Sequence, residues 1–76
     1  MRNSLLALGV AIRAAREHVG LSQEKLAARC GFDRTYISML ERGKRNPSFL
    51  NLERLAKGLG TSVSKLTEQL YGTEPN

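Results

Sequence analysis

The chain has 76 residues, so it forms one small domain that must use most of its length to bury a modest core. Hydrophobic residues make up 41% of it and charged residues 25%, which excludes a disordered chain, and no apolar run approaches the roughly 20 residues of a membrane span. Twelve Lys and Arg against seven Asp and Glu give a formal net charge of +5, which favours a polyanionic partner without identifying it.

The first 20 residues are interpreted as a helix rather than a signal peptide, because Arg13, Arg16 and Glu17 interrupt the apolar stretch. No small-residue cleavage site follows, so we expect a soluble, cytoplasmic protein. Ser4 is the expected N-terminal cap of this helix, and Gly20 is its expected end. One helix face is formed by apolar residues at steps of three and four: Leu5, Leu8, Ile12, Ala15 and Val19.

Two short helices are predicted next. Ser22 is the expected cap of a helix over 23–30, which Gly31 ends. Asp33 is the expected cap of another helix over 34–42. Only narrow apolar stripes can hold this pair against a core: Leu26, Ala27 and Cys30 in the first helix, Ile37 and Leu40 in the second.

A basic loop over 44–47 follows this pair, because the residue before Pro47 is pushed out of the helical backbone region. Ser48 then begins a fourth helix that ends at Gly60, and Ser62 caps a fifth. Apolar spacing predicts their inward faces: Leu52, Leu55, Ala56 and Leu59 in the fourth helix, Val63, Leu66 and Leu70 in the fifth.

No stretch of the chain alternates apolar and polar residues as a half-buried strand does. The predicted fold class is therefore all-α, with five short helices packed as an irregular bundle. We expect a single domain over 1–72 and a flexible tail over 73–76.

The most informative feature is the spacing of the helices over 23–30 and 34–42. A turn of about three residues, which contains Gly31, joins them, and this arrangement is typical of a helix-turn-helix. In such a motif the first helix braces across the DNA backbone, while the second presents its first turn and outer face to the major groove. The spacing therefore predicts a module that binds double-stranded DNA.

The same region contains a series of short strings: Ser22-Gln23-Glu24-Lys25-Leu26-Ala27, Gly31-Phe32, Ile37-Ser38, Glu41-Arg42-Gly43 and Pro47-Ser48. With these strings the chain resembles the phage-repressor and Cro-like (XRE-type) family of helix-turn-helix regulators, over residues 5–70. A longer segment is similar to the recognition segment of restriction-modification controller proteins: Asp33-Arg34-Thr35-Tyr36-Ile37-Ser38, followed by Arg45-Asn46. The resemblance implies a lambda-repressor-like five-helix fold and a homodimer on a pseudo-palindromic operator, which regulates its own gene and a nuclease gene.

The resemblance assigns base reading to the outer face of the recognition helix: Arg34, Thr35, Ser38 and Met39. An arginine can bond bidentately to guanine O6 and N7, which discriminates by about 1–3 kcal/mol, and Arg34 opposes the helix dipole, so stability alone does not select it. Thr35 and Ser38 either reach base edges or phosphates or stay solvated, and Thr35 can offer its methyl group to thymine. Met39 stands where related repressors often carry a polar base reader, so apolar contact and no contact are the alternatives there.

Contacts to the DNA backbone are implied for six residues: Gln23, Tyr36, Arg42, Lys44, Arg45 and Asn46. Gln23 matches the family's phosphate-contacting glutamine, and an exposed helix-starting glutamine is the alternative. Tyr36 can pack by its ring and hold a phosphate by its hydroxyl group. The four residues after the recognition helix would anchor the register on the DNA backbone, with a solvated charge run as the alternative.

Two further sets of residues are implied to be structural. Arg16 and Glu41 match positions that form an internal ion pair between the first helix and the recognition helix in similar repressors. Such a pair fixes geometry more than it adds stability. The dimer seam is implied to lie on the fifth helix, together with the end of the fourth. Ordinary core packing is the alternative, and one helix can serve both uses: Val63, Leu66, Leu70 and Tyr71.

No catalytic group, metal site or cofactor is predicted. Cys30 is the single cysteine and His18 the single histidine, so the chain can form neither an internal disulfide nor an ordinary metal cluster. No nucleophile has a matched base, and no Gly-rich loop could hold a phosphate, so an enzyme is not expected.

An antitoxin, a phage-type repressor and a protein-interaction module are the alternatives to a controller. The resemblance also allows RNA polymerase and a second dimer on an adjacent site as partners, and no membrane partner is expected.

Overall fold

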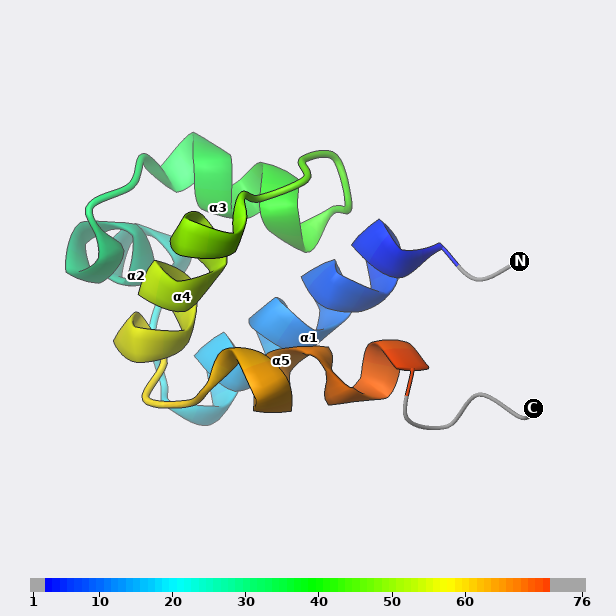
Figure 1. The fold of residues 1–76 in the computed structure, drawn as a ribbon. Helices are drawn as coiled ribbons and strands as arrows, with labels where there is room; N and C mark the ends of the chain where they lie inside the picture. The colour runs from blue at the N-terminus through cyan, green and yellow to red at the C-terminus, as the bar shows by residue number, and fades with distance from the viewer. Residues whose placement is uncertain (1–2, 72–76) are drawn as a thin grey trace.

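Five helices make up the described part of the chain, residues 3–71 of the computed structural model (Figure 1). They are α1 (Ser4–His18), α2 (Gln23–Cys30), α3 (Arg34–Glu41), α4 (Phe49–Gly58) and α5 (Val63–Tyr71). These residues contain no strand, so the all-α fold class is confirmed. None of the five helices is long and apolar enough to cross a membrane. The tail expected over 73–76 and the side chain of Tyr71 lie outside the described residues.

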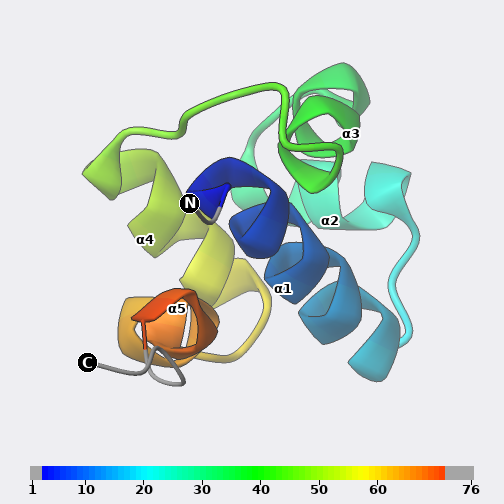
Figure 2. The ribbon, with the colours of Figure 1, turned by 90° about the vertical axis from the view of Figure 1, so that its right-hand side faces the viewer.

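The helices pack around α1, which crosses the middle of the molecule. α1 contacts α3 and α5, and α2 contacts both α3 and α4. Figures 1 and 2 show α3 and α5 at opposite faces of the molecule, with α1 between them. This arrangement leaves the outer side of α3 at the surface.

Apolar residues from all five helices form one core. Its largest fully buried members come from the first four helices: Ile12, Leu26, Ile37, Leu40 and Leu55. Leu66 and Leu70 of α5 are buried in the same cluster. The predicted inward stripe of α1 is wrong at Val19, because the helix ends at His18 and the Val19 side chain, at the C-cap, is exposed.

Serine side chains cap three of the helices, as predicted. Each accepts a hydrogen bond at Oγ from the backbone N–H three residues later, at 3.0, 3.1 and 3.1 Å: Ser22, Ser48 and Ser62. Each bond satisfies one of the backbone donors that a helix start leaves without a partner. The starts of α2, α4 and α5 are therefore local properties of the sequence.

Two of the expected caps differ in the structure. α1 is capped by Asn3 rather than by Ser4: Asn3 Oδ1 accepts from two backbone N–H groups of the first turn at 3.1 Å, and Ser4 is already helical. Asp33 stands at the cap position of α3 with an extended backbone, but its side chain makes no capping hydrogen bond. The first turn of the recognition helix is therefore less strongly capped than that of α2.

α1 passes close to the end of α3 because Gly9 has no side chain. A methyl group placed on its Cα would lie 2.5 Å from the carbonyl oxygen of Glu41 and 2.6 Å from that of Leu40. Both oxygens belong to the backbone, which cannot rotate away as a flexible side chain can. Gly9 therefore determines how closely α1 holds the C-terminal end of α3, a contact that the apolar periodicity did not predict.

Candidate nucleic-acid interface

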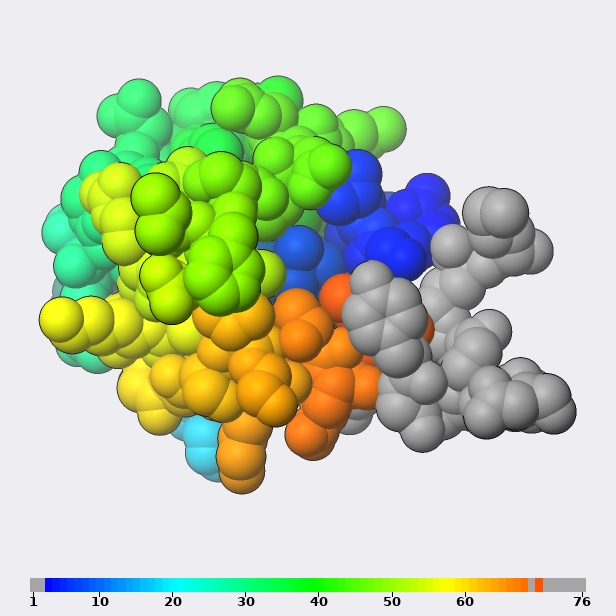
Figure 3. Space-filling view, in the orientation of Figure 1, coloured from blue at the N-terminus to red at the C-terminus, as the bar shows by residue number. Residues whose placement is uncertain are grey.

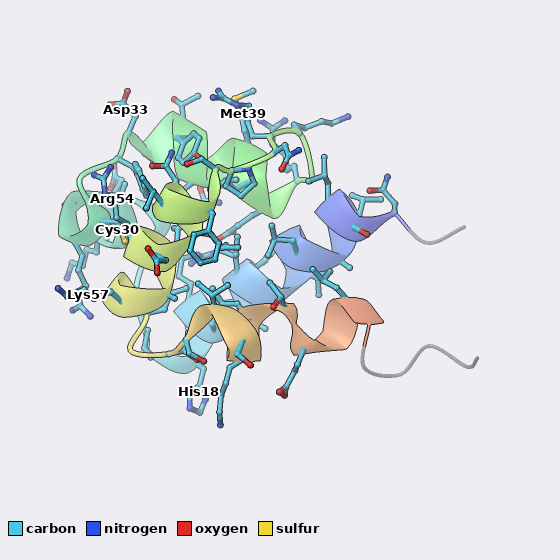
Figure 4. All side chains as sticks on the ribbon, in the orientation of Figure 1. His18, Cys30, Asp33, Met39, Arg54 and Lys57 are labelled. Atoms are coloured by element: carbon cyan, nitrogen blue, oxygen red, sulfur yellow. The ribbon has the colours of Figure 1, made fainter. Side chains whose placement is uncertain are left out.

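The outer side of α3 carries the four residues predicted to read bases: Arg34, Thr35, Ser38 and Met39. The first two are exposed and the last two half-buried. Ile37 and Leu40 are buried on the opposite side, where they hold the helix against the core. Figure 4 shows Asp33 and Met39 above α3, on the side away from α1 and α5. α3 thus presents a mostly polar edge of the width that a major groove admits.

A buried ion pair joins α1 to the end of α3. Arg16 Nε lies 2.6 Å from Glu41 Oε2, and Arg16 Nη2 donates to Glu41 Oε1 at 3.0 Å, so the pairing is bidentate. Arg16 Nη1 also donates to the carbonyl oxygen of Leu21 at 2.9 Å. The paired side chains are only 11% and 4% exposed. The hydrogen bond to Glu41 raises the pKa of Arg16, with burial acting in the opposite direction, so this arginine is charged.

Gln23 extends this network to the start of the recognition helix. Its Nε2 donates to Glu41 Oε1 at 3.0 Å, and its Oε1 accepts from Arg34 Nη1 at 3.2 Å. Because an ionised carboxylate only accepts hydrogen bonds, Glu41 takes the amide nitrogen of Gln23 and leaves the amide oxygen facing Arg34. The glutamine expected to contact a phosphate is thus bonded within the protein at both ends of its amide, and it orients Arg34.

Aromatic rings connect the recognition helix to the basic loop. The rings of Phe32 and Tyr36 pack with centroids 4.8 Å apart, and the guanidinium carbon of Arg45 lies 5.1 Å from the centroid of the Tyr36 ring. Asn51 Nδ2 donates to the Tyr36 hydroxyl oxygen at 3.0 Å. Because that oxygen accepts from α4, the hydroxyl hydrogen can be donated to a phosphate oxygen outside the protein.

Asn51 and Arg54, both on α4, support the site although sequence reasoning did not select them. Arg54 Nη2 donates to the carbonyl oxygen of Cys30 at 2.7 Å, and its guanidinium carbon lies 4.3 Å from the centroid of the Phe32 ring. Arg54 therefore holds the turn between the two helices of the motif. Both residues occupy polar positions of an amphipathic helix, which carry no local signal for such contacts.

The recognition helix borders a hollow of about 400 Å³ on this side of the molecule. Thr35, Tyr36 and Met39 of α3 line it, together with Arg45 of the loop and Asn51 of α4. Most of these residues carry hydrogen-bonding or charged groups. Met39 is the exception among them, because its thioether is only a weak acceptor.

The loop after α3 places basic and polar side chains at the same surface. Arg42, Lys44, Arg45 and Asn46 are all exposed. Arg42 folds back onto the helix, where its Nε donates to the carbonyl oxygen of Ser38 at 3.4 Å. Arg45 lies over the Tyr36 ring, while Lys44 and Asn46 are exposed beside it, an arrangement that suits contacts to a phosphate backbone.

The residues predicted for the dimer seam lie at different depths within their own chain. Leu66 and Leu70 are buried in the core of their own chain, and Val63 is half-buried. Val63 lines a groove between α4 and α5 together with Phe49, which is 63% exposed. Leu50, next in sequence, is exposed as well. The space-filling view shows the first turns of α4 and α5 adjoining on one face (Figure 3).

A second hollow, of about 550 Å³, lies between the C-terminal ends of α2 and α4 and is lined by three cations. Two of them serve as helix caps: Arg29 Nη1 donates to the carbonyl oxygen of Gly58 at 3.3 Å, and Arg54 caps α2 as described. Cys30 is buried at this hollow, and burial raises the pKa of its thiol, so it is a poor nucleophile. These contacts give both arginines a structural role.

A bracing helix and an exposed recognition helix, with basic residues along its edge, define a helix-turn-helix protein that binds DNA. Residues 12–66 match the family described as helix-turn-helix. The chain belongs to this family of DNA-binding regulators, and its resemblance to phage-repressor and Cro-like (XRE-type) regulators is confirmed.

Restriction-modification controller proteins are among its relatives. The chain is 51% identical over 51 residues to the control protein C.MunI of Mycoplasma sp, which covers 67% of this chain and 69% of that protein. It is also similar to the crystal structure of the restriction-modification controller protein C.AhdI from Aeromonas hydrophila, with a TM-score of 0.80 and 42% sequence identity over 82% of this chain and 94% of that one. These relatives confirm the narrower resemblance to controller proteins.

The same fold is also found within an enzyme. Hydroxypropylphosphonic acid epoxidase from S. wedmorenis is similar with a TM-score of 0.80 and 25% sequence identity, over 88% of this chain but only 36% of that one. The likeness therefore concerns one part of a longer protein. The relatives of the present chain include proteins named as control proteins and as HTH-type transcriptional regulators.

Proposed function

We propose that this chain is a restriction-modification controller protein that binds a pseudo-palindromic operator as a homodimer and regulates its own gene and a nuclease gene. The observation that supports this most strongly is the orientation of Arg34 by Gln23, whose amide is itself fixed by the buried Glu41 carboxylate. A preoriented arginine at the start of a recognition helix suits bidentate bonding to guanine O6 and N7.

The proposal divides the surface into two roles. Arg34, with Thr35 and Ser38 beside it, faces base edges and carries sequence discrimination. Tyr36 and the basic loop hold phosphates, which anchors the register and supplies salt-dependent affinity that does not depend on sequence. Asn46 belongs to the residues that hold phosphates.

Because such a regulator works on genomic DNA, we place it in the cytoplasm. A second dimer on an adjacent site and RNA polymerase are further proposed partners, which rest on the resemblance alone.

Substitution of Arg34 and of Arg45 should separate these two roles. On duplexes selected from random DNA, Arg34→Ala should relax discrimination at one base pair per half-site by about 5- to 150-fold, which corresponds to ~1–3 kcal/mol. Arg45→Ala should weaken all sequences alike and reduce the slope of log affinity against log salt by about one per phosphate contact. Measured affinities on cognate and single-mismatch duplexes at several salt concentrations test both.

Arg13→Ala is the matched control, because Arg13 is an exposed arginine of α1 paired with Glu17 at 3.2 Å. It removes the same charge without touching the proposed interface, so it should change neither the preferred sequence nor the salt slope. An unchanged preferred sequence in Arg34→Ala would contradict the proposed base reader. If the affinity of the unmodified protein for DNA does not change with salt concentration, binding through phosphates is contradicted.

The dimer is proposed to form through the groove between α4 and α5, with Phe49 and Val63 at its centre. We expect Phe49→Glu to convert the dimer to a monomer in sedimentation experiments, because association would have to strip water from a charge where an apolar ring now lies. Val10→Glu is the control, since Val10 is equally exposed, at 65% against 63%, but lies on α1. A Phe49→Glu protein that stays dimeric would exclude this seam.

A further inference from the structure

Met39 is an apolar side chain on the edge of α3 that is otherwise polar. It is half-buried, and Figure 4 shows it on the outer side of the helix, away from α1 and α5. The side of α3 that packs into the core is formed by Ile37 and Leu40, which are 0% and 2% exposed. Met39 is therefore not a core residue of this helix, and its apolar character needs another explanation.

Thr35 lies one helical turn before Met39, and both line the hollow of about 400 Å³ beside α3. Residues four apart on a helix are neighbours, with Cβ atoms about 5–6 Å apart, so Thr35 and Met39 lie on the same side of α3. Arg45 of the basic loop and Asn51 of α4 line the same hollow. The hollow therefore combines the apolar groups of Thr35 and Met39 with groups suited to a phosphate or a base edge.

The groups displayed in the major groove limit which parts of a base the apolar groups of Thr35 and Met39 can contact. Hydrogen-bonding groups cover most of each base edge, and the one apolar group displayed there is the C5-methyl group of thymine. Cytosine carries the same group when it is methylated at C5. A thioether cannot donate a hydrogen bond and accepts one only weakly, but it is polarizable and adapts to small apolar surfaces.

We propose that Met39, together with the methyl group of Thr35, binds the C5-methyl group of a pyrimidine in each half-site. This makes Met39 a specificity-determining residue that reads a methyl group rather than a hydrogen-bond pattern. The inference rests on the proposed function, since it requires α3 to occupy a major groove. The methylated pyrimidine would lie in the same half-site as the guanine that Arg34 reads.

The test removes single methyl groups from the DNA. In a selected operator duplex, each thymine is replaced in turn by deoxyuracil, in both half-sites together, which deletes the C5-methyl group and changes no hydrogen-bonding group. The unmodified protein should lose affinity at one such position by about fourfold per half-site, the equivalent of ~0.8 kcal/mol for one buried methyl group. Met39→Ala should lose most of this difference in affinity, and only the contribution of the Thr35 methyl group should remain.

Two further variants refine the assignment. Met39→Leu keeps an apolar side chain of similar size, so it should retain the preference for the methylated base. Thr35→Ser keeps the hydroxyl group and deletes the methyl group, so it should reduce the preference partly. Thermal unfolding of each variant should match that of the unmodified protein, because neither side chain belongs to the buried core.

A second arm distinguishes the two sources of a C5-methyl group. At the sensitive position, duplexes carrying cytosine and 5-methylcytosine are compared, which again differ by one methyl group. A preference of about fourfold per half-site for 5-methylcytosine, mostly lost in Met39→Ala, would show that the site reads the methyl group on either pyrimidine. A preference at thymine alone would restrict the reading to that base and would still support the inference.

The outcomes separate this inference from the function on which it rests. If no duplex is selected, the proposed function fails. If an operator is bound but no thymine shows the effect, or if Met39→Ala responds to deoxyuracil as the unmodified protein does, methyl reading by Met39 is wrong while the proposed function stands.

Discussion

Replacing Glu41 with alanine is expected to lower the free energy of unfolding by about 3–5 kcal/mol, the largest effect of any single substitution considered for this protein. The substitution leaves the Arg16 guanidinium, 11% exposed, without the carboxylate that accepts two of its hydrogen bonds. An uncompensated buried charge is costly because neither water nor another carboxylate can replace the lost partner. Denaturant unfolding followed by circular dichroism measures the change.

Two controls test whether the loss of stability comes from the unpaired charge of Arg16. Arg13→Ala breaks the exposed Arg13–Glu17 pair on the same helix, whose side chains are 63% and 56% exposed, and should cost only about 0.3–0.5 kcal/mol. The double variant Arg16→Met/Glu41→Leu removes both charges and should recover most of the loss. A double variant as unstable as Glu41→Ala would mean that packing, not charge, explains the effect.

The double variant also tests how the recognition helix is oriented. Without Glu41, Gln23 Nε2 has no carboxylate to bond, so the amide of Gln23 is free to rotate and no longer presents its oxygen to Arg34. We therefore expect a folded protein that still binds DNA but discriminates less at the base pair read by Arg34. Unchanged discrimination would show that Gln23 does not orient Arg34.

Gly9→Ala should destabilise the protein by about 1–3 kcal/mol, although alanine is the better helix former. On helix propensity alone the substitution would stabilise α1 by about 1 kcal/mol. The added methyl group, however, would lie 2.5 Å from the carbonyl oxygen of Glu41, so α1 and the end of α3 must move apart. That movement should also weaken operator binding, because Glu41 holds the network that reaches Arg34.

Thermal or denaturant unfolding gives the sign of the Gly9→Ala effect, and affinity for the operator gives its consequence. Val10→Ala, at the next position of the same helix, is the control: its side chain is exposed, so the change should stay within about 0.5 kcal/mol. A stabilised Gly9→Ala protein would mean that the two helices tolerate a wider separation than the structure shows.

Local signals in the sequence were sufficient for the helices themselves. Apolar steps of three and four, serine caps and turn glycines act over at most one helical turn, so they can be read without knowing the fold. The errors were of the same local kind: Asn3 replaces Ser4 as a cap, and the recognition helix ends at Glu41 with Arg42 as its C-cap. The spacing of α2 and α3 was therefore enough to predict a helix-turn-helix.

The internal organisation of the site had no such signal. Gln23 bonds Glu41 across 18 residues, and Asn51 bonds Tyr36 across 15, so neither contact follows from helical period. The resemblance implied the Arg16–Glu41 pair, but it did not imply the hydrogen bonds that join Gln23 to Glu41 and to Arg34. The sequence also could not show which residues of α5 pack into the core and which would form a dimer interface, because both require the same spacing of apolar residues.

The amino-acid sequence by itself determined five helices, the helix-turn-helix and the class of partner, because period, caps and net charge depend on neighbouring residues and on composition. Only the tertiary structure decided the orientation of the Gln23 amide and the need for a glycine at position 9, where α1 passes the end of α3. It also decided that Leu66 and Leu70 belong to the core while Phe49 is exposed. These are properties of surfaces brought together by packing, and they exist only once the helices are placed against one another.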